Sequence, residues 1–426
     1  MQDGMMDKKT NVAAGGAEAE EAGTWTRAER LWEVVGVFLR LGFTAFGGPA
    51  AHIAMMREEI VQRRKWISDQ HFVDLMGEVN LIPGPSSTEL AIYLGYVRAG
   101  WLGLIVGGAC FIGPAMLIVL ALAWAYVRFG TLPQVAWLLY GIKPVIIAII
   151  TCALWGLCRT VLKGWRQVAL ALLVVALYLL GVNVLILLFG GALLFGIVRW
   201  RELWHGRGKE TVVSLALPFS LSGAGAVERM TGLWQRVAPA ALNMGMLAPA
   251  MPFSLLTLFL TFLKIGAVLY GSGYVLLAFL RTDFVLNLRW LTDRQLLDAV
   301  SIGQFTPGPV SSTATFVGYL VGGWQGALVA TLGIFLPSFA FIPIIHPIAA
   351  RLRRSPWTAA LLEGINVAAL ALMAGVLLQL GQNALSDALT WAVALIAFVI
   401  LFRFKLNSVW LILAGAAIGV VRFWLF

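Results

Sequence analysis

The sequence has very little charge for its length. Only 12% of its 426 residues are Asp, Glu, Lys or Arg, while 60% are hydrophobic and the mean hydropathy is +0.86. A typical soluble domain carries about 25% charged residues. This scarcity excludes an ordinary soluble fold, and the long apolar stretches predict membrane-spanning helices. We therefore expect an all-α polytopic membrane protein embedded in the lipid bilayer.

Cysteine and histidine are also scarce. The three cysteines, Cys110, Cys152 and Cys158, lie in apolar segments without metal-ligand spacing, and the four histidines form no HExxH motif. These absences argue against a disulfide framework, a metal site or another cofactor. No basic run with interleaved aromatic residues lies outside the loops, which argues against nucleic-acid binding. The net charge of +10 is better explained by cytoplasmic loops, where Lys and Arg collect.

The chain divides into two apolar halves. Each half has six apolar stretches, and the fifth and sixth stretches are close to or below the roughly 20 residues that a spanning helix needs. We expect about 10–13 transmembrane helices in total. A disordered tail is predicted over 1–23 and a linker over 201–250, which leaves one repeat at 24–200 and a second at 251–426.

The two halves are copies of one another. FLRLGFTAFGG (38–48) aligns with FLKIGAVLYGS (262–272) at a separation of 224 residues. The motif at Pro83, Gly84 and Pro85 recurs at 307–309 with the same separation, which becomes 223 after one deleted position. A register held over so long a distance indicates an internal duplication.

The basic residues indicate that the two copies have opposite orientations in the membrane. The loop at 159–166 carries three basic residues, whereas its counterpart at 382–390 carries none. The loop after the third stretch shows the reverse, with Arg128 alone in the first copy and three basic residues at 351–354. Since Lys and Arg collect in cytoplasmic loops, this exchange predicts inverted-topology repeats. One basic loop, at 57–65, does not follow the pattern.

Each copy contains a helix-breaking Pro-Gly-Pro motif in apolar surroundings. Two prolines around a glycine cannot continue a helix, and a membrane accommodates broken backbone only where protein or a water-filled cavity covers it. A new helix after each motif would present hydroxyl and N–H groups, which favour an anion. The alternative is a purely structural kink, but the occurrence of the motif in both copies favours a binding site.

Two basic residues occupy matching positions in the first helix of each copy. Arg40 lies within VVGVFLRLGFTAF, and Lys264 lies within FLTFLKIGAVLY. A charge inside the membrane is costly and usually marks a substrate path, although such a side chain could instead snorkel to the interface. Gly47, Gly48 and Pro49 follow Arg40 closely and would unwind this helix or let two backbones approach.

Three further charged residues have a weaker claim to function. Glu78 and Glu89 lie near the first Pro-Gly-Pro motif without acidic counterparts, which makes them candidates for a coupling or modulatory role. Lys143 lies beside Pro144 and is matched by Asn366. Lys143 could therefore be a second cation in the substrate path or simply a residue near the interface.

The segments LGFTAFGGP, PGPSSTELAIYLGY and TPGPVSSTATFVGYLVGGWQGALVATLGIFLPSF together resemble the chromate ion transporter (CHR) family in its two-domain form. The resemblance covers about residues 31–200 and 253–425. It implies a multi-pass transporter of the bacterial inner membrane that exports chromate, with sulfate as a related oxyanion, and that gives chromate resistance. It also assigns the family's first-helix basic residue to Arg40. The second copy departs from the family's Gly-Gly-Pro motif with Gly271, Ser272 and Gly273.

The residues themselves predict an inverted-repeat carrier for a small anion, and chromate comes from the resemblance alone. A channel lined by the same groups is one alternative. A membrane-embedded lipid-modifying enzyme is another, but it would need convergent catalytic groups or a metal motif. The expected partners are the small oxyanion, the lipid bilayer and a second copy of the chain in a homodimer. The predicted substrate-binding residues are Arg40, Gly47, Gly48, Pro49, Pro83, Gly84, Pro85, Ser86, Ser87, Thr88, Lys264, Pro307, Gly308, Pro309, Ser311, Ser312 and Thr313.

Overall fold

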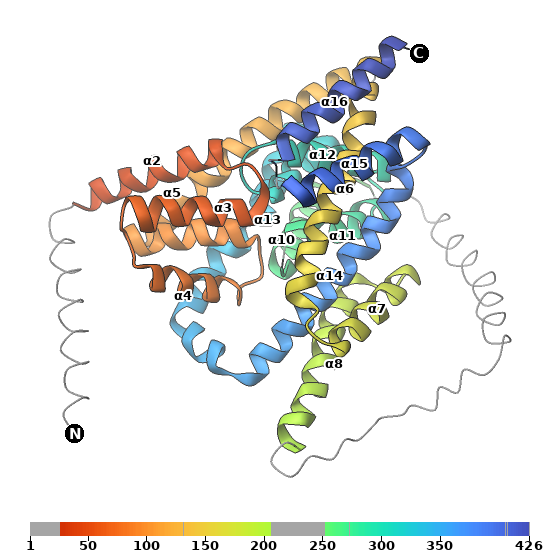
Figure 1. Cartoon of the computed structure of the whole chain (residues 1–426). Helices are drawn as coiled ribbons and strands as arrows, with labels where there is room; N and C mark the ends of the chain where they lie inside the picture. Colours follow the sequence, from red (N-terminus) through yellow and green to blue (C-terminus); the bar gives the residue numbers. More distant parts are fainter. Residues whose placement is uncertain are drawn as a thin grey trace, which may run out of the picture.

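The chain folds into a helical assembly made of two matching series of helices (Figure 1). The computed structural model describes residues 26–130, 132–205, 252–271, 273–404, 406 and 408–425. The first series contains α2 (Arg27–Thr44), α3 (Gly48–Arg57), the π-helix η1 (Glu58–Arg63), α4 (Asp69–Val79), α5 (Ser86–Phe129), α6 (Pro133–Val161), α7 (Trp165–Leu179) and α8 (Val184–His205). The second contains α10 (Leu255–Val268), η2 (Gly273–Val275), α11 (Leu276–Leu280), the π-helix η3 (Arg281–Asn287), α12 (Asp293–Phe305), η4 (Val310–Ser312), α13 (Thr313–Arg354), α14 (Pro356–Ala384), α15 (Ala388–Phe404) and α16 (Ser408–Leu425).

Matching side chains begin α4 of the first series and α12 of the second. Ser68 accepts a hydrogen bond from the backbone N–H of His71 at the start of α4. Thr292 does the same at the start of α12 and forms a capping box with Gln295. Such caps satisfy N–H groups that have no partner inside the helix. The duplication therefore extends to the local signals that start these helices.

Both Pro-Gly-Pro motifs interrupt the helical backbone, as predicted. In the first repeat α4 ends at Val79 and α5 begins at Ser86; in the second, α12 ends at Phe305 and α13 begins at Thr313. Helix α4 has 11 residues, which at 1.5 Å per residue is about 16 Å. That length is about half of the ~30 Å hydrocarbon core of a bilayer, so α4 can reach only part of the way across.

Helix α5 folds back on itself soon after the motif. Its backbone leaves the helical region at Ala99 and Gly100, and Gly100 has a φ of 65°. A Cβ atom on Gly95 would lie 2.3 Å from the carbonyl oxygen of Gly103, so the two arms of this hairpin touch through their backbones. Helix α13 repeats the turn at Gly322 and Gly323 and the close approach between Gly318 and Gly326. Each motif is therefore flanked on both sides by short helical segments.

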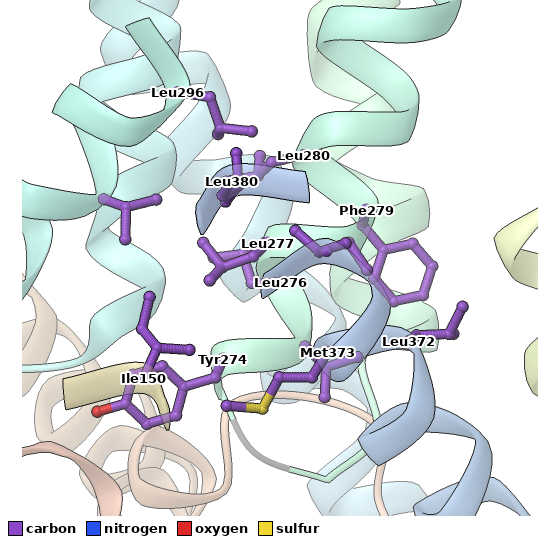
Figure 2. Packing of buried hydrophobic residues seen from close by; sticks show 14 of the residues in the cluster. Ile150, Tyr274, Leu276, Leu277, Phe279, Leu280, Leu296, Leu372, Met373 and Leu380 are labelled. Carbon is purple, nitrogen blue, oxygen red and sulfur yellow. The ribbon is translucent and has the colours of Figure 1, made fainter. Parts of the chain in front are cut away.

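The repeats exchange helices when they pack. Helix α6 of the first repeat packs against α15 and α16 of the second, while α14 packs against α7 and α8 of the first. The long helices α5 and α13 meet each other. A large cluster of buried apolar side chains joins the two repeats, and Figure 2 shows part of this cluster around α11, α12 and α14. The duplicated halves thus form one body with a shared core.

The surface of the helices is suited to lipid. Among the described residues, four helical segments are long and apolar enough to cross a membrane, and α7, α10, α15, α16 and the apolar part of α8 are shorter. Large apolar side chains such as Leu117, Leu172 and Leu332 are at least 60% exposed, which is unfavourable in water but not in hydrocarbon. The chain is therefore an all-α polytopic membrane protein, as predicted. The predicted tail at 1–23 and most of the predicted linker at 201–250 lie outside the described residues.

Candidate functional site

The Gly-Gly-Pro motif ends the first helix inside the protein. Helix α2 stops at Thr44, and α3 begins at Gly48 with a proline in its first turn. Between them Gly47 has a φ of 104° and Gly48 a φ of 79°, which residues with a Cβ atom rarely adopt. The motif thus unwinds the first helix, which is one of the two roles that the sequence suggested for it.

Each Pro-Gly-Pro motif reaches the end of the first helix of the opposite repeat. The backbone N–H of Gly84 donates to the carbonyl oxygen of Leu269, with an N···O distance of 2.6 Å. The N–H of Gly308 donates to the carbonyl oxygen of Ala45 at 2.8 Å. Ala45 and Leu269 occupy the same position in the two repeats, as do the two glycines. Each broken segment is therefore joined by its backbone to the end of the first helix of the other repeat.

Only glycine fits at these two contacts. Gly84 and Gly308 both have positive φ values, 150° and 89°. A Cβ atom on Gly84 would lie 2.2 Å from Oε1 of Glu89, and one on Gly308 would lie 2.7 Å from the Cβ of Ala115. The repeated glycine is thus required both by backbone conformation and by close packing.

A cavity of about 540 Å³ lies beside the broken segments. This volume is in the range of small-molecule sites. Both repeats line it, and most of the lining is apolar. Its polar side chains are neutral, and none of the described residues that line it carries a charge. The lining residues are Gly47, Pro49, Ala50, Ile53, Met76, Asn80, Ser86, Ala153, Gly156, Leu157, Val161, Gly271, Tyr274, Val275, Asn366, Ala369, Leu370 and Met373.

The hydroxyl groups after the Pro-Gly-Pro motifs have different surroundings. Ser86 lines the cavity, and its Oγ lies 3.3 Å from the carbonyl oxygen of Gly271 in the other repeat. Ser87 is buried and pairs with Nδ1 of His52 at 3.3 Å. In the second repeat Thr313 donates to the carbonyl oxygen of Val310 at 2.8 Å. Of the predicted hydroxyls, only Ser86 therefore reaches the cavity.

Three other predicted hydroxyls are buried beside the motifs. Thr88, Ser311 and Ser312 are fully buried, and their hydroxyl oxygen atoms have no hydrogen-bond partner among the described residues. A buried hydroxyl without a partner is unfavourable unless a water molecule or ligand satisfies it. None of the three is part of the cavity lining.

The two first-helix cations form matching ion pairs outside the cavity. Arg40 pairs with Glu59 at 3.7 Å, and Lys264 pairs with Asp283 at 2.7 Å. Both acids lie in the π-helices, at equivalent positions of the two repeats. Arg40 remains 61% exposed. The structure thus gives both cations a protein partner, and their predicted role in binding substrate stays a prediction.

The three modulatory candidates also have partners. Lys143 pairs with Asp298 of the second repeat at 2.8 Å, and both side chains are largely buried. Glu78 accepts a hydrogen bond from the hydroxyl of Tyr93. Glu89 is fully buried, and its Oε1 lies 3.4 Å from Oγ of Ser338. None of the three candidates lines the cavity.

Sequence reasoning missed most of the cavity wall. Asn80 and Gln304 precede the two Pro-Gly-Pro motifs at matching positions, which was an available signal. Asn80 lines the cavity, and Oε1 of Gln304 accepts a hydrogen bond at 3.5 Å from the hydroxyl of Tyr274, which also lines it. The contributions of α6 and α14 depend on how the repeats pack, and their sequences give no sign of them.

Two interlocked helical repeats, broken near a shared cavity inside an apolar shell, define a polytopic membrane transport protein. The sequence profile described as "Chromate transporter" matches residues 32–197 and 256–420, which together are most of the chain. The chain belongs to the chromate transporter family, in its long two-domain form.

Proteins named as chromate transport proteins or probable chromate transport proteins are similar to the chain over nearly its whole length. The chromate transport protein of Cupriavidus metallidurans is 33% identical over 395 residues, which cover 92% of this chain and 93% of the relative. The probable chromate transport protein of Synechococcus elongatus is 31% identical over 93% of this chain and 96% of the relative. The chromate transport protein of Pseudomonas aeruginosa is 31% identical, with 91% of each chain covered. No solved structure matches the chain.

Proposed function

We propose that the protein exports chromate across the bacterial inner membrane and thereby gives chromate resistance, with sulfate as a second substrate. The observation that carries the proposal is the cavity beside the broken helices, which both repeats line. Three relatives that align with more than nine-tenths of the chain are named chromate transport proteins, one of them a probable one. Chromate and sulfate are both tetrahedral dianions, so one set of hydrogen-bond donors suits both.

The cavity wall suits an anion that must be released again. The amide groups of Asn80 and Asn366 and the hydroxyls of Ser86 and Tyr274 are neutral donors. Ser86 lies in the first turn of α5, where free N–H groups and the helix dipole favour negative charge. Neutral donors hold a dianion less tightly than a buried cation would, and transport requires that binding be weak enough for release.

The membrane potential can drive export of a dianion without a coupling ion. At about 100 mV, negative inside, each charge gains about 2.3 kcal/mol on leaving the cell, so a dianion gains about 4.6 kcal/mol. At about 1.4 kcal/mol per factor of ten, this sustains a gradient on the order of a thousandfold. We therefore propose a gated, potential-driven exporter in which Glu78 and Glu89 have structural or modulatory roles.

Purified protein in liposomes tests this function. A potassium-valinomycin potential without a pH gradient should move labelled chromate, and sulfate should compete. If the potential moves no chromate and a pH gradient restores transport, the potential-driven mechanism is wrong. Discrete single-channel currents in planar bilayers would favour an anion channel, while conversion of lipid headgroups would favour an enzyme.

A pair of asparagines on one helix tests the proposed site. Asn366 lines the cavity, whereas Asn383 is exposed near the end of α14 and donates a hydrogen bond to the carbonyl oxygen of Gln379. Replacing Asn366 by Leu removes a donor from the cavity wall, so chromate flux should fall at least about tenfold. Asn383→Leu should leave the flux unchanged. Equal fluxes from the two variants would remove the cavity from the proposal.

The expected homodimer is part of the same proposal. Large apolar side chains remain exposed on α15 and α16, among them Trp391 and Trp410, and either lipid or a second copy could cover them. The mass of the protein in a defined lipid nanodisc would show one chain or two.

A further inference from the structure

Residues that line the cavity have counterparts in the other repeat, because the wall can be mapped through the duplication. Ile53 corresponds to Leu277 at a separation of 224 residues, and Leu157 corresponds to Leu380 at 223. The mapping also runs in the other direction, from Met373 to Ile150. The chain thus contains two related sets of residues. The open set, at the cavity, includes Ile53, Leu157 and Met373, and the closed set consists of their counterparts Leu277, Leu380 and Ile150.

The second set is closed. Leu277 is 4% exposed, and Leu380 and Ile150 are both 0% exposed. Figure 2 shows these three side chains within one packed cluster, together with Tyr274 and Leu296. In contrast, Ile53 and Leu157 are only partly buried and face the cavity. The same wall is therefore open in one copy and filled with side chains in the other.

The residue that matches Asn366 forms a buried ion pair. Lys143 is the counterpart of Asn366, which lines the open cavity. The ammonium group of Lys143 lies 2.8 Å from Oδ1 of Asp298, while Oδ2 of Asp298 accepts a hydrogen bond from Tyr126 at 2.8 Å. The side chains of Lys143 and Asp298 are only 13% and 2% exposed. Where the open cavity has the neutral amide of Asn366, the matching residue is thus a cation.

We propose that the closed set is a second oxyanion-binding vestibule, which opens to the opposite face of the membrane and in which Lys143 binds the dianion. This inference rests on the proposed function. Leu277, Leu380 and Ile150 form its gate. Inverted repeats can exchange conformations, so that one copy adopts the state of the other. When the second vestibule opens, the cavity around Ile53 and Leu157 closes.

Substrate can replace Asp298 as the partner of Lys143. Separating a buried ion pair leaves an uncompensated charge, which is strongly unfavourable. A dianion that enters the vestibule gives Lys143 a new negative partner, while Asp298 keeps its hydrogen bond from Tyr126, so the open state is favoured when substrate is bound. The same exchange limits opening without substrate and prevents an open pore.

Matched cysteines test the second vestibule. On a background without Cys110, Cys152 and Cys158, Ile53→Cys should react with a membrane-impermeant thiol reagent from one face, with or without chromate. Leu277→Cys should react only from the opposite face, and at least about tenfold faster during chromate transport. Right-side-out and inside-out vesicles separate the two faces.

The possible outcomes separate this inference from the proposed function. If wild-type protein moves neither chromate nor sulfate, the proposed function fails. If the Leu277→Cys protein transports chromate but its cysteine stays unreactive, or reacts from the same face as Cys at position 53, the second vestibule is refuted. Leu157→Cys and Leu380→Cys form a second matched pair, should Leu277→Cys not fold.

Substitutions of Lys143 test its role as the cation. Lys143→Asn copies the residue of the open cavity and should raise the KM for chromate at least about tenfold. It should also abolish the acceleration of labelling at Leu277→Cys, while labelling at Ile53→Cys stays normal and shows that the protein is folded. Lys143→Arg keeps the charge and should retain part of the transport. A wild-type KM in Lys143→Asn protein would overturn the assignment.

Discussion

The two repeats share their ion pairs but not the surroundings of those pairs. Arg57 binds Asp69 in the first repeat, and Arg281 binds Asp293 at the equivalent place in the second, each with a distance of 2.7 Å. Arg57 is 47% exposed, whereas Arg281 is 12% exposed. The same ion pair is therefore exposed in one repeat and within packed protein in the other.

The sequence explains part of this difference in exposure. Arg281 also donates a hydrogen bond to Gln379 at 2.6 Å. The counterpart of Gln379 in the first repeat is Gly156, which lines the cavity. A glycine on one side and a long amide on the other favour the conformation in which the first cavity is open. The duplication thus supplies two similar sets of residues, and single substitutions make one set open and the other packed.

The glycines of the Pro-Gly-Pro motifs should show the largest effect. Gly308→Ala combines a positive φ with a contact of 2.7 Å to Ala115. We expect a loss of roughly 2–4 kcal/mol in stability, from about 1 for the backbone and about 1–3 for overpacking. Gly181 has a similar φ of 86° but open space around it, so Gly181→Ala should cost only about 1 kcal/mol. Thermal unfolding in detergent would measure both, and equal losses would contradict the packing argument.

Filling the open cavity should abolish transport with little effect on folding. Gly156→Gln gives the first repeat the residue of the second, and a Cβ atom at Gly156 meets no other atom within 4 Å. We expect chromate flux to fall by at least about a hundredfold because the side chain occupies the cavity. Gly156→Ala adds one methyl group and should keep most of the flux. Full activity of Gly156→Gln protein in liposomes would show that chromate does not pass through this cavity.

Replacing the two first-helix cations should change stability less than the glycine substitutions, and by unequal amounts. The pair of Lys264 and Asp283 is shorter than that of Arg40 and Glu59, at 2.7 Å against 3.7 Å, and Lys264 is less exposed. Lys264→Ala should therefore lower the melting temperature more than Arg40→Ala, since a shielded ion pair is screened less by solvent.

A transport assay separates a role of Arg40 in substrate binding from its role in the ion pair with Glu59. As a binding residue, it should give no chromate flux when replaced by Ala and partial flux when replaced by Lys, the residue at the matching position. A wild-type flux from Arg40→Ala protein would leave Arg40 only its ion pair with Glu59.

Local sequence signals predicted much of the fold. The two Pro-Gly-Pro breaks were predicted because they act over a few residues, and the caps at Ser68 and Thr292 are equally local signals. The ion pairs of the two first-helix cations could also have been predicted. Lys264 and Asp283 are 19 residues apart, and Arg40 and Glu59 have the same separation.

The contacts between repeats could not be predicted. The hydrogen bond from Gly84 to Leu269 joins residues that are far apart in the chain, and it exists only after both repeats have folded and interlocked. The contribution of Asn366 to the cavity and the pairing of Lys143 with Asp298 likewise depend on tertiary packing. A sequence pattern shows which residues match, but packing decides which of them meet.

The opposite orientation of the repeats is the central claim, because the cavity and the proposed second vestibule must face opposite sides of the membrane. Leu132 and Ser355 are matching residues that precede α6 and α14. Single cysteines at these positions, on a background without the three native cysteines, should react with an impermeant thiol reagent from opposite faces of the membrane. Reaction of both cysteines from the same face would contradict the inverted arrangement and the account of transport built on it.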